Sequence, residues 1–353
     1  MRRIQTEQIT GKEILAKDIY SSSGVVLISE GTTLKKAYIS KLLELKITDV
    51  FVEDTISKDI SREDITEEKI SKQCIDKLQS TLESLSLSEE KESQQLIGVA
   101  TELMEGVLMQ DEVIYTISNV RNYSKSLYEH MLSVASLAVL IAIRAGYPRE
   151  RVEDIATGAL LHDIGFESVK ADYKGMLLED LEEEAQKDVK RHVVYGYIEV
   201  EHQTWLNPIA KEIILYHHER LNRTGYPFHI PGDKIKSEVR LVMICDAFDN
   251  MVYGNLEPRK KVYEALDEIM KNGGVAFDAE LVKIFVRSVA AYPTGSLVSL
   301  SNGSRGIVIR QNADAPTRPI VRLLEKDEND EWVSKEEINL SEKLTLFIAD
   351  TIE

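Results

Sequence analysis

The sequence predicts a mainly α-helical protein, in which an antiparallel helical bundle is flanked by a small N-terminal α+β module and a small C-terminal β-rich module. Apolar residues repeat at helical spacing in the central part of the chain, whereas they alternate near both ends. In the central part, histidines and aspartates recur at intervals of about 25 to 32 residues, about one helix with its connection. With 353 residues, 43% of them hydrophobic, the chain can bury a sizeable core in two or three domains.

The sequence predicts the small α+β module in residues 1–55. An apolar strand at residues 25–28 precedes a helix, and a second strand follows near residues 50–52. The helix is expected to carry the apolar residues Leu34, Ile39, Leu42 and Leu43. The sequence assigns no role to this module.

Residues 56–95 form an acidic, serine-rich connector. Leu78, Leu82 and Leu85 recur in it at helical spacing. We expect a solvated connecting helix, whose leucine stripe offers a surface for a homodimer.

Residues 96–292 predict the helical bundle. Between residues 124 and 144, His130 shares a helical stripe with the apolar positions Leu127, Val134, Leu137, Ala138 and Ile141. Pro148 suits the first turn of the next helix and Gly165 the position just past its end. His162 and Asp163 are therefore expected in the last turn of that helix.

Residues 293–353 predict a compact, barrel-like β-rich module. Alternating segments at residues 297–300, 307–309 and 320–324 indicate strands. The Asn302-Gly303 pair between the first two is a strong hairpin signal. An interaction or regulatory role is one interpretation of this module.

Composition narrows the functional classes. The net charge of −17 disfavours binding to nucleic acid polymers or to anionic membranes, because no basic surplus exists. The longest uncharged apolar run, residues 131–143, is about half of a bilayer span, and no signal-peptide core is seen, so no membrane segment is expected. Two cysteines in so long a chain indicate free thiols in a reducing compartment, which predicts a cytoplasmic protein.

Five of the seven histidines form an ordered series with two aspartates. Alone, His130 or His192 is more often a core or surface histidine than a ligand, but the joint pattern favours a metal centre. His202 and His229 fit no series and are interpreted as surface residues. The series comprises His130, His162 with Asp163, His192, His217 with His218, and Asp246. Imidazole and carboxylate ligands without thiolate favour iron or manganese, with zinc as an alternative, at a reactive site.

The segment from about residue 122 to 290 resembles the HD-GYP domains, a branch of the HD phosphohydrolase superfamily that cleaves cyclic di-GMP. The resemblance covers about half of the chain, and its motifs occur in the family's order and spacing. They are Tyr128-Glu129-His130, Leu160-Leu161-His162-Asp163-Ile164-Gly165, Lys190-Arg191-His192 with Tyr195-Gly196, His217-His218-Glu219-Arg220, Gly225-Tyr226-Pro227 and Asp246-Ala247-Phe248-Asp249.

The resemblance implies an HD-type bundle with two divalent transition metals bridged by the Asp163 carboxylate. His130, His162 and Asp246 would complete one coordination sphere, and His192, His217 and His218 the other. His162 and Asp163 are thus the candidate catalytic residues, since two metals held close together can drive hydrolysis of a phosphodiester. A glutamate that would serve a third metal is replaced by Ser126, so two metals are expected.

The substrate implied by the resemblance is a cyclic dinucleotide. The Gly225-Tyr226-Pro227 turn would shape its pocket, with the tyrosine ring as a stacking face; without the family, this tripeptide is only a turn. Arg220, and Arg223 in a position where glycine is common, are candidate contacts to it.

The expected reaction is hydrolysis of cyclic di-GMP to linear pGpG, and further to GMP as an extension. One departure favours a different class, because Phe166 replaces the family's usual lysine after the His-Asp-x-Gly motif. Loss of one such donor typically lowers turnover on the order of a hundredfold to a thousandfold. The alternatives are a sensor of cyclic dinucleotides or redox state that keeps the metals, and an HD-superfamily nucleotide phosphohydrolase.

Overall fold

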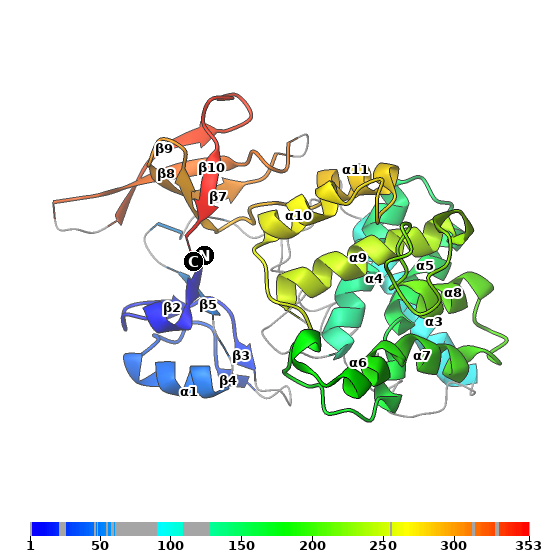
Figure 1. Cartoon of the computed structure of the whole chain (residues 1–353). Helices are drawn as coiled ribbons and strands as arrows, with labels where there is room; N and C mark the ends of the chain where they lie inside the picture. Colours follow the sequence, from blue (N-terminus) through cyan, green and yellow to red (C-terminus); the bar gives the residue numbers. More distant parts are fainter. Residues whose placement is uncertain are drawn as a thin grey trace. The chain divides into compact units, whose positions relative to one another are not determined.

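The computed structural model of the chain describes residues 2–20, 26–45, 47, 49–53, 56–57, 60, 90–108, 127–254, 256–312, 315–328 and 332–352 (Figure 1). The chain divides into two compact units. One comprises residues 1–65, 114–124 and 289–353, and the other residues 66–113 and 125–288. The expected leucine stripe of the connector, Cys74 and Ser126 lie outside the described residues.

The N-terminal part of the first unit has the predicted α+β character. Its strands are β1 (Arg2–Gln5), β2 (Ile14–Leu15), β3 (Ile19–Tyr20), β4 (Val26–Ile28) and β5 (Asp49–Glu53), and its helices are η1 (Thr6–Gln8), η2 (Lys36–Tyr38) and α1 (Ile39–Glu44). The strand β5 lies between β1 and β2, while β3 pairs with β4. Leu34 was expected in the helix but precedes it, because its main-chain N–H bonds to the Glu13 carbonyl; its side chain is fully buried in the module's core.

The C-terminal part of the first unit is a five-stranded antiparallel sheet in the order β10-β6-β7-β8-β9. The strands are β6 (Leu297–Leu300), β7 (Arg305–Arg310), β8 (Ile320–Lys326), β9 (Trp332–Asn339) and β10 (Ile348–Thr351). The Asn302-Gly303 hairpin joins β6 to β7 as predicted, and the positive φ of 85° at Gly303 explains the glycine. Ile56 and Ile60 pack against Ile307 and Leu324 of this sheet.

The second unit is the predicted helical bundle. Its helices are α3 (Glu90–Leu108), α4 (Leu127–Arg144), α5 (Arg149–Leu161), η4 (Ile164–Ser168), η5 (Leu178–Asp180), α6 (Glu183–Lys190), α7 (His192–Val200), α8 (Pro208–Tyr216), η6 (Gly232–Lys234), α9 (Ser237–Tyr253), α10 (Val262–Lys271) and α11 (Ala279–Ser288). The helix α4 contacts α3, α5, α9 and α11, and α8 contacts α5, α7 and α9 (Figure 1). The helices α4, α5, α7, α8 and α9 thus form one continuous core.

Among the described helices, α4 alone is long and apolar enough to cross a membrane. It is 67% buried inside the bundle, however, and its buried face includes His130, Met131 and Leu137. A helix in the centre of a bundle is expected to be apolar on nearly all sides. The apolar character of α4 therefore follows from its position in the core.

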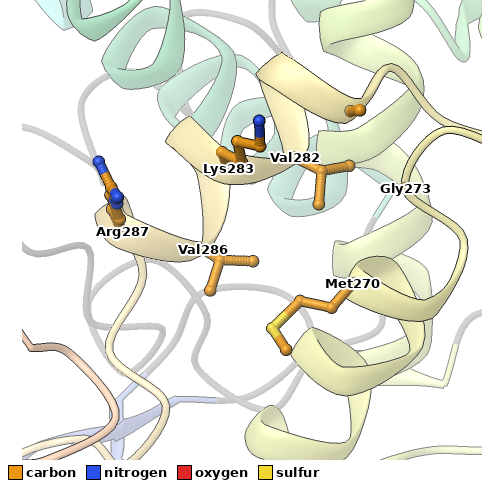
Figure 2. A pocket seen from close by; sticks show the side chains of 7 residues that line it. Met270, Gly273, Val282, Lys283, Val286 and Arg287 are labelled. Carbon is orange, nitrogen blue, oxygen red and sulfur yellow. The ribbon is translucent and has the colours of Figure 1, made fainter.

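The helices α10 and α11 enclose an open apolar groove of about 340 Å³ (Figure 2). Its lining residues are Met270, Gly273, Ala279, Val282, Lys283, Val286 and Arg287. None of them belongs to the histidine and aspartate series, so this groove is separate from the candidate metal centre.

Candidate metal centre

The seven residues of the predicted series are brought together inside the bundle. His130 lies on α4, His162 and Asp163 directly follow α5, and His192 begins α7. His217 and His218 follow α8, and Asp246 lies on α9. Six of the seven are buried, and the His218 side chain keeps 15% exposure. Helix α5 ends at Leu161, three residues before the end that was expected just ahead of Gly165, so His162 occupies its C-cap and Asp163 lies beyond the helix.

Main-chain carbonyls fix the orientation of three imidazoles. The Nδ1–H of His162 donates to the Ala159 carbonyl at 2.7 Å, and that of His192 donates to the Val189 carbonyl at 2.7 Å. His217 Nδ1–H is shared between the carbonyls of Ile213 and Ile214, both at 3.1 Å. Because a carbonyl can only accept, each Nδ1 carries the proton and each Nε2 is left with its lone pair.

His130 is oriented by a carboxylate instead. Its Nδ1–H donates to Asp249 Oδ2 at 2.6 Å, and the Ser133 hydroxyl donates to the other Asp249 oxygen. The Nε2 lone pair of His130 therefore faces the interior as well. Histidine ligands of metals almost always donate their second ring nitrogen in this way.

The free Nε2 atoms meet in two pairs. Those of His130 and His162 are 3.2 Å apart, and those of His192 and His217 are 3.5 Å apart. Two lone pairs that face each other at such distances repel unless a cation lies between them. Each pair is therefore a suitable half of a metal coordination sphere.

Asp163 contacts both pairs with different oxygens. Its Oδ2 lies 3.3 Å from the Nε2 atoms of both His130 and His162. Its Oδ1 lies 3.2 Å from His192 Nε2 and 3.5 Å from His217 Nε2. The potential ligand atoms accordingly form two groups that share Asp163.

Asp246 and His218 adjoin this arrangement. Asp246 Oδ1 lies 3.3 Å from His130 Nε2 and 3.7 Å from His162 Nε2, and its Oδ2 lies 3.4 Å from His218 Nδ1. Asn250, one turn later on α9, donates to Asp246 Oδ1 at 2.7 Å. Within the described residues, the buried Asp163 Oδ1 and Asp246 Oδ2 receive no hydrogen bond. Unpaired carboxylate oxygens beside imidazole lone pairs fit divalent metal ions well.

The electrostatics of the cluster keep its acids ionised. Burial would raise the pKa of Asp163, but His162 and the other imidazoles around it hold this pKa well below its usual value. Burial acts in the same direction on Asp246, and His218 with the other histidines outweighs it, so its pKa is also lowered. Both residues therefore remain available as anionic ligands.

The pKa values of the histidines shift in two opposite directions. Burial lowers the pKa of His217, and burial together with the neighbouring His217 lowers the pKa of His218 well below its usual value. Burial would lower the pKa of His130 too, but Asp163, Asp246 and Asp249 raise it well above its ordinary value. The carboxylates thus stabilise a positive charge near His130, which a proton or a metal ion can supply.

A close crossing of η4 and α7 positions Asp163 against His192. A Cβ atom on Gly165 would lie 1.9 Å from the His192 carbonyl oxygen and 2.4 Å from the Gly196 nitrogen. Gly196 lies on the other side of the same contact, since a Cβ there would be 3.2 Å from the Gly165 nitrogen. The sequence predicted Gly165 as a helix cap, but its role is to allow this contact between main chains.

The turn at residues 225–227 lies against the ligand groups. The Tyr226 ring stacks on His218 with centroids 4.7 Å apart, and Pro227 follows through a cis peptide bond. A Cβ on Gly225 would lie 2.3 Å from the His218 carbonyl oxygen, so only glycine fits beside the end of α8. Burial, Asp246 and Asp163 raise the pKa of Tyr226 well above its usual value, which keeps its hydroxyl protonated.

Comparison with known proteins identifies this arrangement. The family model "HD domain" matches residues 127–251, and "KOW domain associated with HD domain" matches residues 297–353. The chain thus contains an HD domain, and its site motifs are similar to those of HD-GYP proteins. Similar chains include Cyclic di-GMP phosphodiesterase PA4108 of Pseudomonas aeruginosa, which is 28% identical over 63% of this chain and 53% of its own length.

A second curated protein and one solved structure are also similar to this chain. The cyclic di-GMP phosphodiesterase response regulator RpfG of Xanthomonas campestris pv. campestris is 30% identical over 44% of this chain and 42% of its own. The solved structure of Bd1817, described as an HDG"Y"P protein of Bdellovibrio bacteriovorus, superposes with a TM-score of 0.57 at 16% identity. It covers 80% of this chain and 97% of its own, and it shows the shared fold. The chain spans about half the length of the curated relatives it matches.

Phe166, the departure from the HD-GYP lysine, lies directly on a candidate ligand. Its ring stacks on His192 with centroids 4.1 Å apart and an interplanar angle of 12°, and Tyr173 lies 5.2 Å from it. An apolar ring thus lies beside His192 at the position where the HD-GYP family usually has a lysine. The sequence predicted the loss of the charge but could not predict this packing.

The two predicted arginine contacts differ in their surroundings. The Arg220 Nη1 donates to the carbonyls of His217 and Glu219 at 3.2 and 2.7 Å, and its guanidinium lies over the Phe277 ring. Arg220 therefore secures the end of α8. Arg223 is exposed and has a positive φ of 65°, a conformation that suits the glycine common at this position in the family.

Two acidic residues of the site were missed as functional residues, although both stand in the motifs. Asp249 holds His130, and the buried Glu219 accepts the Phe228 N–H at 2.8 Å, which ties down the turn that carries Tyr226. The spacing of Asp249, three residues after Asp246 on one helix face, was the available signal. His202 and His229 are exposed, as the sequence predicted.

Proposed function

We propose that this chain is a metal-dependent phosphodiesterase that hydrolyses cyclic di-GMP to linear pGpG, and further to GMP, through a binuclear His/Asp site. One observation carries the proposal. The Nε2 atoms of two histidine pairs converge on the two different oxygens of one carboxylate, Asp163. The names of the HD-GYP relatives support the substrate class.

The ligand sets would be arranged as follows. His130, His162 and Asp246 would hold one divalent metal, and His192, His217 and His218 the other, with Asp163 shared between them. Iron or manganese suits this imidazole and carboxylate set, and zinc is the alternative, because no thiolate is present among the candidate ligands. Such metals supply Lewis-acid polarisation of a phosphodiester and an activated water.

The protein's own residues would position the substrate. Tyr226 offers a ring face and a protonated hydroxyl beside His218, while Glu219 and Gly225 hold its turn in place. Asp249, Asn250 and the carbonyls at the ends of the helices keep the ligands in one orientation, so little reorganisation is needed for catalysis. We assign the reaction to the cytoplasm, in keeping with the free, buried thiol of Cys245.

Chromatography of products tests the proposal. Protein reconstituted anaerobically with iron or manganese is incubated with cyclic di-GMP, beside an Asp163→Ala control. Linear pGpG formed only by the unaltered protein supports the phosphodiesterase. Absence of product from fully metal-loaded protein refutes it.

A second function, sensing of a cyclic dinucleotide without turnover, is favoured by Phe166 on His192. A fully metal-loaded protein that binds cyclic di-GMP but leaves it intact would support this sensor. Competition between cyclic di-GMP and a panel of mononucleotides separates both functions from a nucleotide phosphohydrolase.

A further inference from the structure

A cyclic dinucleotide carries two phosphodiester groups, and a single pair of metals can hold only one of them. The second group keeps its negative charge and has to enter a protein whose net charge is −17. Anionic groups of this kind are usually bound through charge-assisted hydrogen bonds from lysine or arginine. A cation beside the metal centre is therefore needed.

Two nearby side chains do not meet this need. Phe166 carries no charge, and its ring packs on His192. Arg220 is tied to two main-chain carbonyls and to the Phe277 ring. Moving its guanidinium onto a phosphate would break these contacts at the end of α8.

Lys190 is placed differently. It is the last residue of α6, two positions before His192, and it is half-buried. Its ammonium lies over the Tyr226 ring, 5.9 Å from the centroid, and that ring stacks on His218. A single aromatic ring therefore links Lys190 to the candidate metal ligands.

The Lys190 ammonium is also available for a ligand. Within the described part of the chain it forms no ion pair, and the side chain that it contacts is the Tyr226 ring. Lys187 on the same helix is instead paired with Glu183 at 2.8 Å and with Glu184 at 2.9 Å. A lysine ammonium held over an aromatic ring still has N–H donors on the side away from the ring that can bind an anion.

We propose that Lys190 binds the phosphodiester of the cyclic dinucleotide that is not under attack, with Tyr226 as the surface that positions its ammonium. This inference rests on the proposed function. Lys190 is a substrate-binding residue for the second phosphate, and it makes a cyclic dinucleotide a better substrate than a simple phosphodiester.

The test compares two substrates on reconstituted protein. Cyclic di-GMP has two phosphodiesters, whereas bis(p-nitrophenyl) phosphate has one and reports on the metal centre alone. We expect Lys190→Ala to raise KM for cyclic di-GMP about tenfold to a hundredfold, as for loss of a hydrogen bond to a charged group. KM and kcat for bis(p-nitrophenyl) phosphate, and the metal content, should remain unchanged.

Two further variants sharpen the comparison. Lys190→Arg, which keeps the charge, should retain most of the affinity for cyclic di-GMP. Lys187→Ala removes an exposed cation from the same helix and should leave both substrates unaffected. If Lys190→Ala is not recovered as folded protein, Lys190→Gln, which preserves the length of the stem, takes its place.

The possible outcomes distinguish a failure of the Lys190 assignment from a failure of the proposed function. Cleavage of cyclic di-GMP by the unaltered protein with an unchanged KM in Lys190→Ala would refute the role of Lys190 alone. Equal losses on both substrates would place Lys190 at the reacting phosphate and overturn the assignment to the second one. If the unaltered protein neither binds nor cleaves cyclic di-GMP, the proposed function fails, and the role of Lys190 fails with it.

Discussion

At the scale of single residues, Asp163 is the one residue shared by both groups of candidate ligands. Its two oxygens contact different imidazole pairs. We expect Asp163→Ala to lose both metals together, because neither ligand group keeps its shared carboxylate. Elemental analysis after anaerobic purification measures this loss. The control is His202→Ala, whose side chain is 90% exposed, and which should retain the full metal content. Retention of one equivalent in Asp163→Ala would contradict a bridging role.

Asp249 acts through another residue, because it touches His130 and Ser133. Asp249→Asn can present its amide NH₂ group to His130 Nδ1 and so favour the wrong tautomer. We expect metal affinity to fall about tenfold to a hundredfold, the usual effect of losing such a partner. Competition with a chelator measures the affinity. An unchanged affinity would show that the helix positions His130 without help from Asp249.

Phe166 tests whether the missing lysine limits catalysis. Phe166→Lys places an ammonium beside His192 and is expected to raise kcat on the order of a hundredfold, since one stabilising donor is restored. Metal content should not change. Phe166→Leu supplies apolar bulk without charge and should give no gain. A gain in both variants would attribute the effect to removal of the stacked ring.

At this scale the sequence could predict which histidines and aspartates come together, because their spacing repeats with the helices. It could not predict which ring nitrogen faces the interior. That choice depends on carbonyls at the ends of α5, α6 and α8, whose positions are set by where each helix ends. The packing of Phe166 on His192 was likewise hidden, because the two residues belong to different elements.

At the scale of elements, the crossing of η4 and α7 holds Asp163 and His192 together. Gly165→Ala would place a methyl group 1.9 Å from the His192 carbonyl oxygen and force the two main chains apart. We expect a loss of about 1 to 3 kcal/mol in the free energy of unfolding, as for other overpacked sites. Denaturant unfolding measures this loss. Gly98→Ala in α3, where a Cβ meets nothing within 4 Å, should instead be neutral or stabilising.

The element predictions failed where tertiary contacts override local signals. Gly165 suits a helix end by sequence, and it was interpreted as one, yet its missing side chain serves the contact with Gly196. Leu34 has the periodicity of a helix, but a main-chain bond to Glu13 holds it outside. By contrast, the hairpin at Asn302-Gly303 was predictable because a turn is determined within a few residues.

At the scale of the whole molecule, the metal centre belongs to one of the two compact units. Its helices bury carboxylates and imidazole lone pairs that repel one another without a cation. Metals that bind only the folded state stabilise it by mass action, by about 2.7 kcal/mol at a hundredfold excess over Kd. We therefore expect a chelator to lower the Tm of the unit that holds the site. The described residues of the other unit, which comprises residues 1–65, 114–124 and 289–353, include none of the candidate ligands, so its transition should not move. Scanning calorimetry with and without chelator resolves the two transitions. In Asp163→Ala, the chelator should change the Tm of neither transition. A shift of both transitions by the same amount would show that the two units unfold as one.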